Sequence, residues 1–110
     1  MLDPVIHQAT RLRIMAALQR NREASFTGLR DALGLTDGNL ASHATALEKA
    51  GYLESRRVLS ALHFELRYRI TPKGDAAFRA YAEELLALLG HEGGGPRPNA
   101  DSATFMPDPS

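Results

Sequence analysis

Short polar side chains fill one stretch of the sequence, residues 36–49, where a surface helix usually carries long charged ones. Drawn as a helix at about 100° per residue, this stretch places Leu40, Ala44 and Leu47 on one face. The opposite face has hydrogen-bonding tips and gaps at Gly and Ala, which would let a helix approach base edges in the major groove of DNA. Ordinary capping and turn chemistry accounts for the "TDGN" start equally well. The candidate DNA contacts are Thr36, Gly38, Asn39, Ser42, His43, Thr45 and Lys49.

Arginines in a second segment, residues 53–70, are candidates for holding the DNA backbone. Apolar and polar residues alternate between Leu62 and Ile70, which predicts a strand with one polar face. The polar face of an antiparallel pair is often only a solvated surface. A stripe of guanidinium groups beside a DNA-contacting helix would instead hold phosphates, and we slightly favour this interpretation. The candidate phosphate contacts are Arg56, Arg67 and Arg69.

Catalytic and metal-binding chemistry has little support in the sequence. The chain has no cysteine, which excludes disulfides, thiolate nucleophiles and cysteine-ligated zinc. Glu83 and Glu84 are adjacent, so their carboxylates diverge on a helix and do not form a catalytic pair. We therefore expect no enzyme, no metal and no cofactor. The histidines fall on four different predicted elements, at His7, His43, His63 and His91.

Length, composition and charge place these candidates in one small domain. The chain has 110 residues and is 44% hydrophobic, which permits a buried core. Basic and acidic residues balance at 13 each, so the net charge gives only weak support for nucleic-acid binding. No apolar run approaches about 18 residues and no signal-peptide pattern is present, so we expect no membrane association and a cytoplasmic location. Gly, Pro, Ser and Asp dominate the end of the chain, which predicts a domain over 1–90 and a disordered tail over 91–110.

Three helices are predicted in the first half of the chain. Asp3 is a suitable N-cap for a helix through "RLRIMAALQRN". A second helix is predicted between a cap at Thr27 and a left-handed end at Gly34, and a third between a cap at Thr36 and an end at Gly51. The second and third helices, joined by a short turn, would form a helix-turn-helix.

A hairpin and a last helix are predicted to follow. Leu53–Leu59 and Leu62–Ile70 have the alternation of paired strands, and Ser25-Phe26 reads as a short extended piece. Thr71 would cap the last helix, in which Gly74 is expected to loosen the first turn. The order is helix, short strand, helix, helix, hairpin, helix. The predicted fold class is therefore mainly α with a small β-hairpin (α+β), arranged as a winged helix-turn-helix.

Three stretches resemble the small MarR-like and ArsR-like winged helix-turn-helix transcriptional regulators of bacteria and archaea. They are "DPVIHQATRLRIMAAL", "SFTGLRDALGLTDGNLASHATALEKAGYLE" and "YRITPKGDAAF", which with the hairpin cover residues 3–82. The resemblance implies a homodimeric, sequence-specific DNA-binding protein, with a repressor as our expectation, on half-sites about 34–36 Å apart. It also implies that the first and last helices form the dimer interface. The expected interface residues are Val5, Ala9, Phe78, Tyr81, Leu85, Leu88 and Leu89.

The hairpin departs from the pattern of this group. Its tip is "SALHFEL", with no arginine between Arg57 and Arg67, where the group usually has a basic run. The alternative hypothesis is therefore a protein-interaction module that has lost its basic wing and binds a protein partner. A sensor of a small apolar ligand at the dimer interface also remains open. The residues expected to meet a protein partner are Leu62, Phe64 and Leu66.

Overall fold

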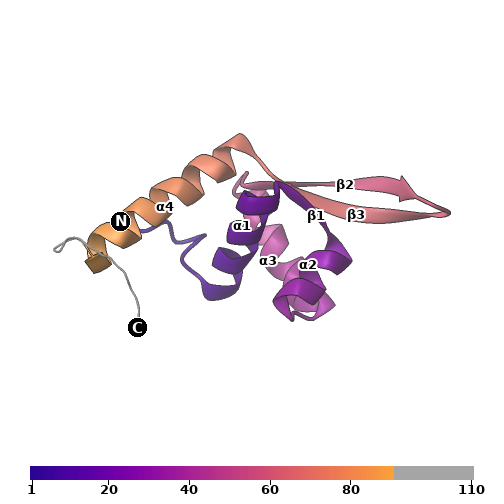
Figure 1. Cartoon of the computed structure of the whole chain (residues 1–110), viewed down its shortest axis with the longest axis horizontal. Coiled ribbons are helices and arrows are strands. Elements are labelled where there is room, and N and C mark those ends of the chain that lie inside the picture. Colours follow the sequence, from indigo (N-terminus) through magenta and orange to yellow (C-terminus); the bar gives the residue numbers. More distant parts are fainter. Residues whose placement is uncertain (91–110) are drawn as a thin grey trace, which may run out of the picture.

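The predicted order of elements is present in the computed structural model, which describes residues 1–90, with Ser60 described by its backbone alone. The prediction of a disordered tail over 91–110 lies outside the described residues. A three-stranded sheet and four helices form the winged helix-turn-helix (Figure 1). The elements are α1 (Ala9–Asn21), β1 (Glu23–Ser25), α2 (Phe26–Leu33), α3 (Asp37–Lys49), β2 (Leu53–Ser60), β3 (His63–Ile70) and α4 (Pro72–Gly90).

The first helix begins later than predicted. Gln8 is the N-cap of α1, and its side chain accepts a hydrogen bond from the Arg11 backbone N–H at 2.8 Å. Asp3 instead closes a separate turn, accepting from the Val5 N–H through its carboxylate and from the His7 N–H through its carbonyl. The prediction of one continuous helix from Asp3 was wrong, because Asp3 caps a short turn and Gln8 then caps a separate helix. Val5 therefore lies before α1 and not on it.

Caps fix the two helices of the helix-turn-helix. Ser25, and not the predicted Thr27, caps α2, since its Oγ accepts from the Gly28 N–H at 3.0 Å. Gly34 ends α2 in the left-handed region at φ 66°, as predicted. Thr36 caps α3 as predicted, with its Oγ1 accepting from the Asn39 N–H at 3.1 Å. These caps set a short turn between α2 and α3.

The sheet has the strand order β1-β3-β2, with both pairs antiparallel. The short extended piece lies at Glu23–Ser25, earlier than the predicted Ser25-Phe26, and it pairs with β3. Opposite residues of an antiparallel pair point to the same face. Leu53 and Ile70 are one such pair, and both are buried against the helices. The hairpin of β2 and β3, which we call the wing, projects beyond the helices (Figure 1).

The core lies where α1, α3 and the base of the wing meet. One connected cluster joins side chains of the N-terminal segment, four helices and two strands. Ala44 of α3 is fully buried in this cluster, on the inner face that the helical projection predicted. The largest fully buried side chains are Ile6, Ile14, Met15, Leu18, Leu40 and Leu47.

The start of α4 is closely packed. Thr71 Oγ1 accepts from the Gly74 N–H at 2.9 Å, which confirms the predicted cap. A Cβ at Gly74 would lie 2.2 Å from the Tyr52 carbonyl oxygen. The prediction that Gly74 loosens the helix was therefore wrong. Its lack of a side chain instead lets α4 contact the turn between α3 and β2. The far end of α4 extends away from the core (Figure 1).

Candidate nucleic-acid interface

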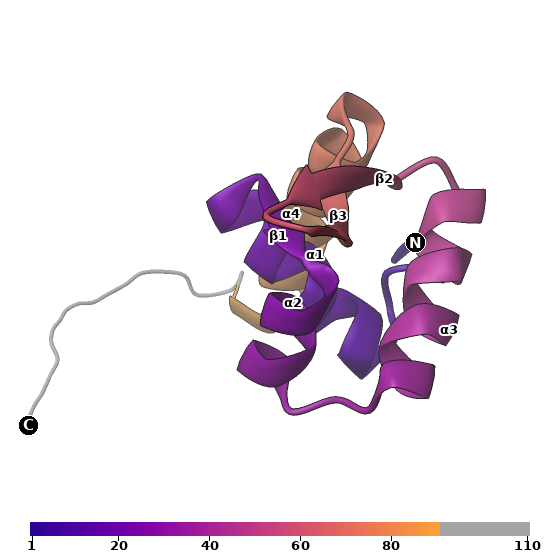
Figure 2. The same ribbon diagram turned by 90° about the vertical axis from the view of Figure 1, so that its right-hand side faces the viewer.

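The predicted DNA-contacting face of α3 lies on the outside of the molecule (Figure 2). Leu40, Ala44 and Leu47 are fully buried on the opposite face, as the helical projection required. The outer face therefore belongs to a helix that its own core holds rigidly in place. Thr36, Gly38, Asn39, Ser42, Thr45 and Lys49 are exposed, and His43 at the border is half-buried.

The outer surface of α3 is shallow, since the side chains on it are short. Ala41, Ser42, Thr45, Ala46 and Lys49 line a hollow along the helix. Such a surface leaves room for base edges, which long side chains would keep at a distance. Hydroxyl and amide tips at its edges can donate to bases or phosphates.

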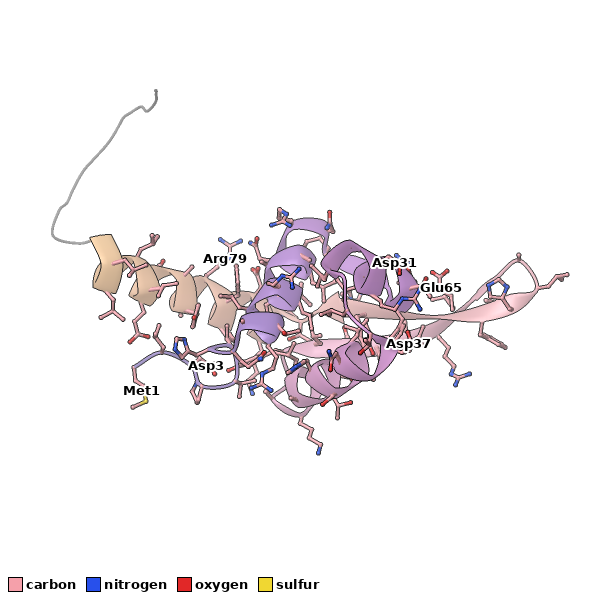
Figure 3. The ribbon with its side chains drawn as sticks, turned by 90° about the horizontal axis from the view of Figure 1, so that it is seen from below. Met1, Asp3, Asp31, Asp37, Glu65 and Arg79 are labelled. Atoms are coloured by element: carbon pink, nitrogen blue, oxygen red, sulfur yellow. The ribbon has the colours of Figure 1, made fainter. Side chains whose placement is uncertain are left out.

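An arginine bridge ties the start of α3 to α2. Arg30 of α2 donates to the carboxylates of Asp31 and Asp37, each at 2.9 Å. Figure 3 labels the two aspartates, Asp31 on α2 and Asp37 on α3. The hydrogen bond to Asp31, followed by that to Asp37, raises the pKa of Arg30 further above its usual value. The positive charge of Arg30 offsets Asp37, whose carboxylate would otherwise repel phosphate at the N-terminus of α3.

The three predicted phosphate-contacting arginines lie together on one face of the wing. Arg56 is the Cα partner of Arg67, so the two side chains share a face, and Arg69 follows two residues along. Each of the three already forms an ion pair with a carboxylate of the same sheet. The shortest ion pairs are Arg56 to Glu23 at 3.3 Å, Arg67 to Glu65 at 2.7 Å and Arg69 to Glu54 at 2.9 Å.

This arginine face is the one turned away from α3. Ser55 lies on the other face of β2, and its hydroxyl donates to Glu48 of α3 at 2.7 Å. Tyr68, the Cα partner of Ser55, is buried on the same side. The structure thus brings the predicted arginines together but does not place them beside α3.

Arg57 is a functional candidate that the sequence reasoning missed. It lies two residues beyond Ser55 and opposite Leu66, on the face of the sheet that α3 contacts. Its side chain is exposed, and none of the ion pairs found within residues 1–90 involves it. Counting alternation outward from the buried Leu53 would have identified this position. Arg57 and Lys49 are therefore the cations best placed beside α3.

The predicted dimer-interface residues fall into two groups. Tyr81 is only 4% exposed, and its hydroxyl lies 2.9 Å from His7 Nδ1. It therefore belongs to the chain's own core, and we remove it from the proposed interface residues. Val5, Phe78 and Leu85 are half-buried against the same core. Ala9 is exposed on α1, and Leu88 and Leu89 are exposed by 67% and 74% on the far end of α4.

The wing tip presents apolar side chains to solvent. Leu62 at the turn is 98% exposed, and Leu59 and Phe64 are each 63% exposed. Leu66, nearer the core, is half-buried and lines a groove with Phe26 of α2. Within the described part of the chain, no group of three or more His, Asp or Glu side chains is placed to hold a metal ion. No helix among residues 1–90 has the length and apolarity to cross a membrane.

A protein-family model described as winged helix DNA-binding domain matches residues 10–89. An uncharacterized protein of Methanocaldococcus jannaschii, MJ0432, is 33% identical over 84 residues, which cover 76% of this chain and 91% of that protein. The family model spans the helix-turn-helix, the wing and most of α4.

Solved structures share the fold. The transcriptional regulator homologue from Pyrococcus horikoshii OT3 superposes with a TM-score of 0.74 at 30% identity, covering 77% of this chain and 84% of that one. Overoxidized AbfR bound to DNA has a TM-score of 0.68 at 19% identity over 77% of this chain and 62% of its own, which is a likeness of fold alone. The matches describe DNA-binding regulators and not enzymes, as the sequence predicted.

Proposed function

The chain belongs to the winged helix DNA-binding domain family, and we propose that it is a sequence-specific transcriptional regulator whose α3 enters the major groove. The observation that supports this most is the outer face of α3. That face is exposed, short-chained and rich in hydrogen-bonding tips, and a buried apolar face holds it in place. A helix with these properties can approach base edges along most of its length.

Separate roles follow for the residues on and beside α3. Asn39 is suited to a bidentate contact with adenine, while Ser42, His43 and Thr45 can contact bases or nearby phosphates. Thr36 and Gly38 bring the start of the helix close to the duplex. Lys49 and Arg57 carry charge that is free to hold phosphates. Arg56, Arg67 and Arg69 would need to exchange their glutamate partners for phosphate to contribute.

The proposed assembly is a homodimer that acts as a repressor. Exposed leucines at the far end of α4 give two copies an apolar surface to bury. Two α3 helices related by a two-fold axis would contact half-sites about 34–36 Å apart on a near-palindromic operator. A regulator of this kind works where the chromosome is, so we propose a cytoplasmic location.

Selection of bound duplexes from a random pool tests the proposal and supplies the operator. With that operator, Asn39→Ala should weaken binding by roughly 1–3 kcal/mol and relax selectivity at one base pair, as measured by fluorescence anisotropy. Asn21→Ala removes the same amide from the end of α1, away from α3, and should bind like the wild type. Unchanged affinity and selectivity for Asn39→Ala would remove α3 from the interface.

A second candidate function is a protein-interaction module, favoured by the exposed apolar wing tip. In this case the selection would yield no enriched sequence. Affinity for any duplex would stay weak, and its logarithm would fall with the logarithm of salt concentration far less steeply than about 0.9 per phosphate contact.

A further inference from the structure

The apolar side chains of the wing form one row that continues the core outward. On the face that α3 contacts, the strand pairs run from buried Leu53 and Ile70, through Arg57 and Leu66, to exposed Leu59 and Phe64. Leu62 stands beyond them at the turn. An antiparallel sheet commonly places apolar side chains on the face that packs on the core and polar ones on the face in solvent. Here the alternation persists past the core to the tip.

The tip projects into solvent, and only its base borders the groove that Phe64 and Leu66 line with Phe26. Leu59 and Phe64 are direct Cα partners, so their side chains lie side by side on one face. The backbone of Ala61 takes a left-handed conformation at φ 54°, which closes the turn tightly and leaves Leu62 at its end. A projecting apolar hairpin fits a partner that offers a narrow groove.

The position of the tip connects it to the DNA interface. Arg57 lies on the same face as Leu59, between the tip and the contact of Ser55 with α3. Its unmatched positive charge suits the phosphates that border a groove. On the opposite face of the wing, Glu65 and Arg67 neutralise each other. The charge beside the apolar row therefore favours a polyanion over a neutral protein surface.

We infer that Leu62, with Leu59 and Phe64 behind it, inserts as an apolar wedge into the minor groove next to the major groove that α3 occupies. This inference rests on the proposed DNA-binding function. Leu and Phe are side chains that proteins insert between base steps, where they unstack the bases and bend the duplex. Flexible pyrimidine–purine steps unstack most easily, so one such step is expected under each wing.

The test uses the full chain and a duplex of about 30 base pairs that carries the selected operator. A 2-aminopurine at the step under the wing reports unstacking, and dyes on the two ends report bending. The wild type should raise the 2-aminopurine fluorescence and bring the ends closer. Leu62→Asn, of similar size but polar, should abolish both signals and weaken binding about tenfold, whereas Leu62→Met should retain them. Val58→Ala, on the face of β2 opposite Leu59, should behave like the wild type.

The outcomes separate this inference from the proposed function. If the wild type binds its operator without unstacking or bending it, and Leu62→Asn binds equally well, the wedge is overturned while DNA binding stands. If Leu62→Asn leaves the DNA signals unchanged but lowers the mass measured by sedimentation, the tip contacts a second copy of the chain. The wedge is again overturned. If the wild type binds no duplex, both the wedge and the proposed function fail.

Discussion

Gly74 has no room for even one additional carbon atom. The position of its missing Cβ is 2.2 Å from the Tyr52 carbonyl oxygen and 3.0 Å from the Tyr52 Cα. These are backbone atoms that cannot rotate away, so Gly74→Ala must push α4 off the turn that follows α3. We expect a loss of roughly 1–3 kcal/mol in the free energy of unfolding, measured by urea denaturation.

Gly38→Ala is the matched control for this substitution. Gly38 also lies in the first turn of a helix, but no atom lies within 4 Å of its Cβ position. Alanine favours the helix over glycine by roughly 0.5–1 kcal/mol, so this variant should be slightly more stable than the wild type. Equal stabilities for the two variants would contradict the close contact at Gly74.

Residue-level chemistry could be predicted where it depends on adjacent atoms. Thr36 and Gly34 were predicted correctly because a cap hydrogen bond or a left-handed end involves only the next few residues. The cap of α2 was predicted at the wrong residue, because Ser25 and Thr27 are both suitable N-cap residues. Pairing of Ser25 with Arg67 holds Ser25 extended and decides between them. Such pairing between distant residues cannot be predicted from the local sequence pattern.

At the scale of elements, the N-terminal segment is held to the turn between α3 and β2 by one side-chain contact. The Tyr52 hydroxyl donates a hydrogen bond to the Asp3 carboxylate. That bond, with burial and the charge of Asp3, raises the pKa of Tyr52 to about 12, from about 10 in an unfolded chain. The contact therefore stabilises the fold while Tyr52 is protonated.

The sign of the shift gives a pH prediction. A raised folded-state pKa means that the stabilisation is fully present below pH about 10 and is lost as the pH rises towards about 12. Urea denaturation of the wild type should therefore show falling stability across this window. Tyr52→Phe lacks the hydroxyl, so it should start lower and decline less steeply. Parallel declines for the two proteins would show that Tyr52 is not the titrating group.

Strand alternation could predict which residues share a face but not which face meets α3. The sequence correctly grouped Arg56, Arg67 and Arg69. It missed that Glu23 and Glu54, from neighbouring strands, would compensate them, because that depends on register. It also missed Arg57, since the packing of α3 against β2 selects the face.

At the scale of the whole molecule, apolar surface is concentrated at two opposite ends. The wing tip lies at one end and the far end of α4 at the other, with α3 between them (Figure 1). The sequence predicted both as apolar, but only the structure separates the core residue Tyr81 from exposed Leu88 and Leu89. One end is thus available to a second copy while the other remains free for DNA.

The dimer prediction belongs to this scale. On the helical projection of α4, Leu85 and Leu89 share a face with Leu88 beside it, whereas Ala87 points to the opposite side. If two copies bury the leucine face, Leu89→Asp would place an unpaired carboxylate between them, at a cost of several kcal/mol. We expect this variant to sediment as a monomer and to lose the affinity that two linked half-sites provide.

Ala87→Asp adds the same charge to the outer side of the helix and should remain dimeric. Because Leu89 is exposed in the single chain, Leu89→Asp should leave the circular dichroism and the urea midpoint of a monomer nearly unchanged. A mutant that folds normally yet still sediments with twice the mass of the chain would place the interface elsewhere. The exposed Ala9 of α1 would then be the next surface to test.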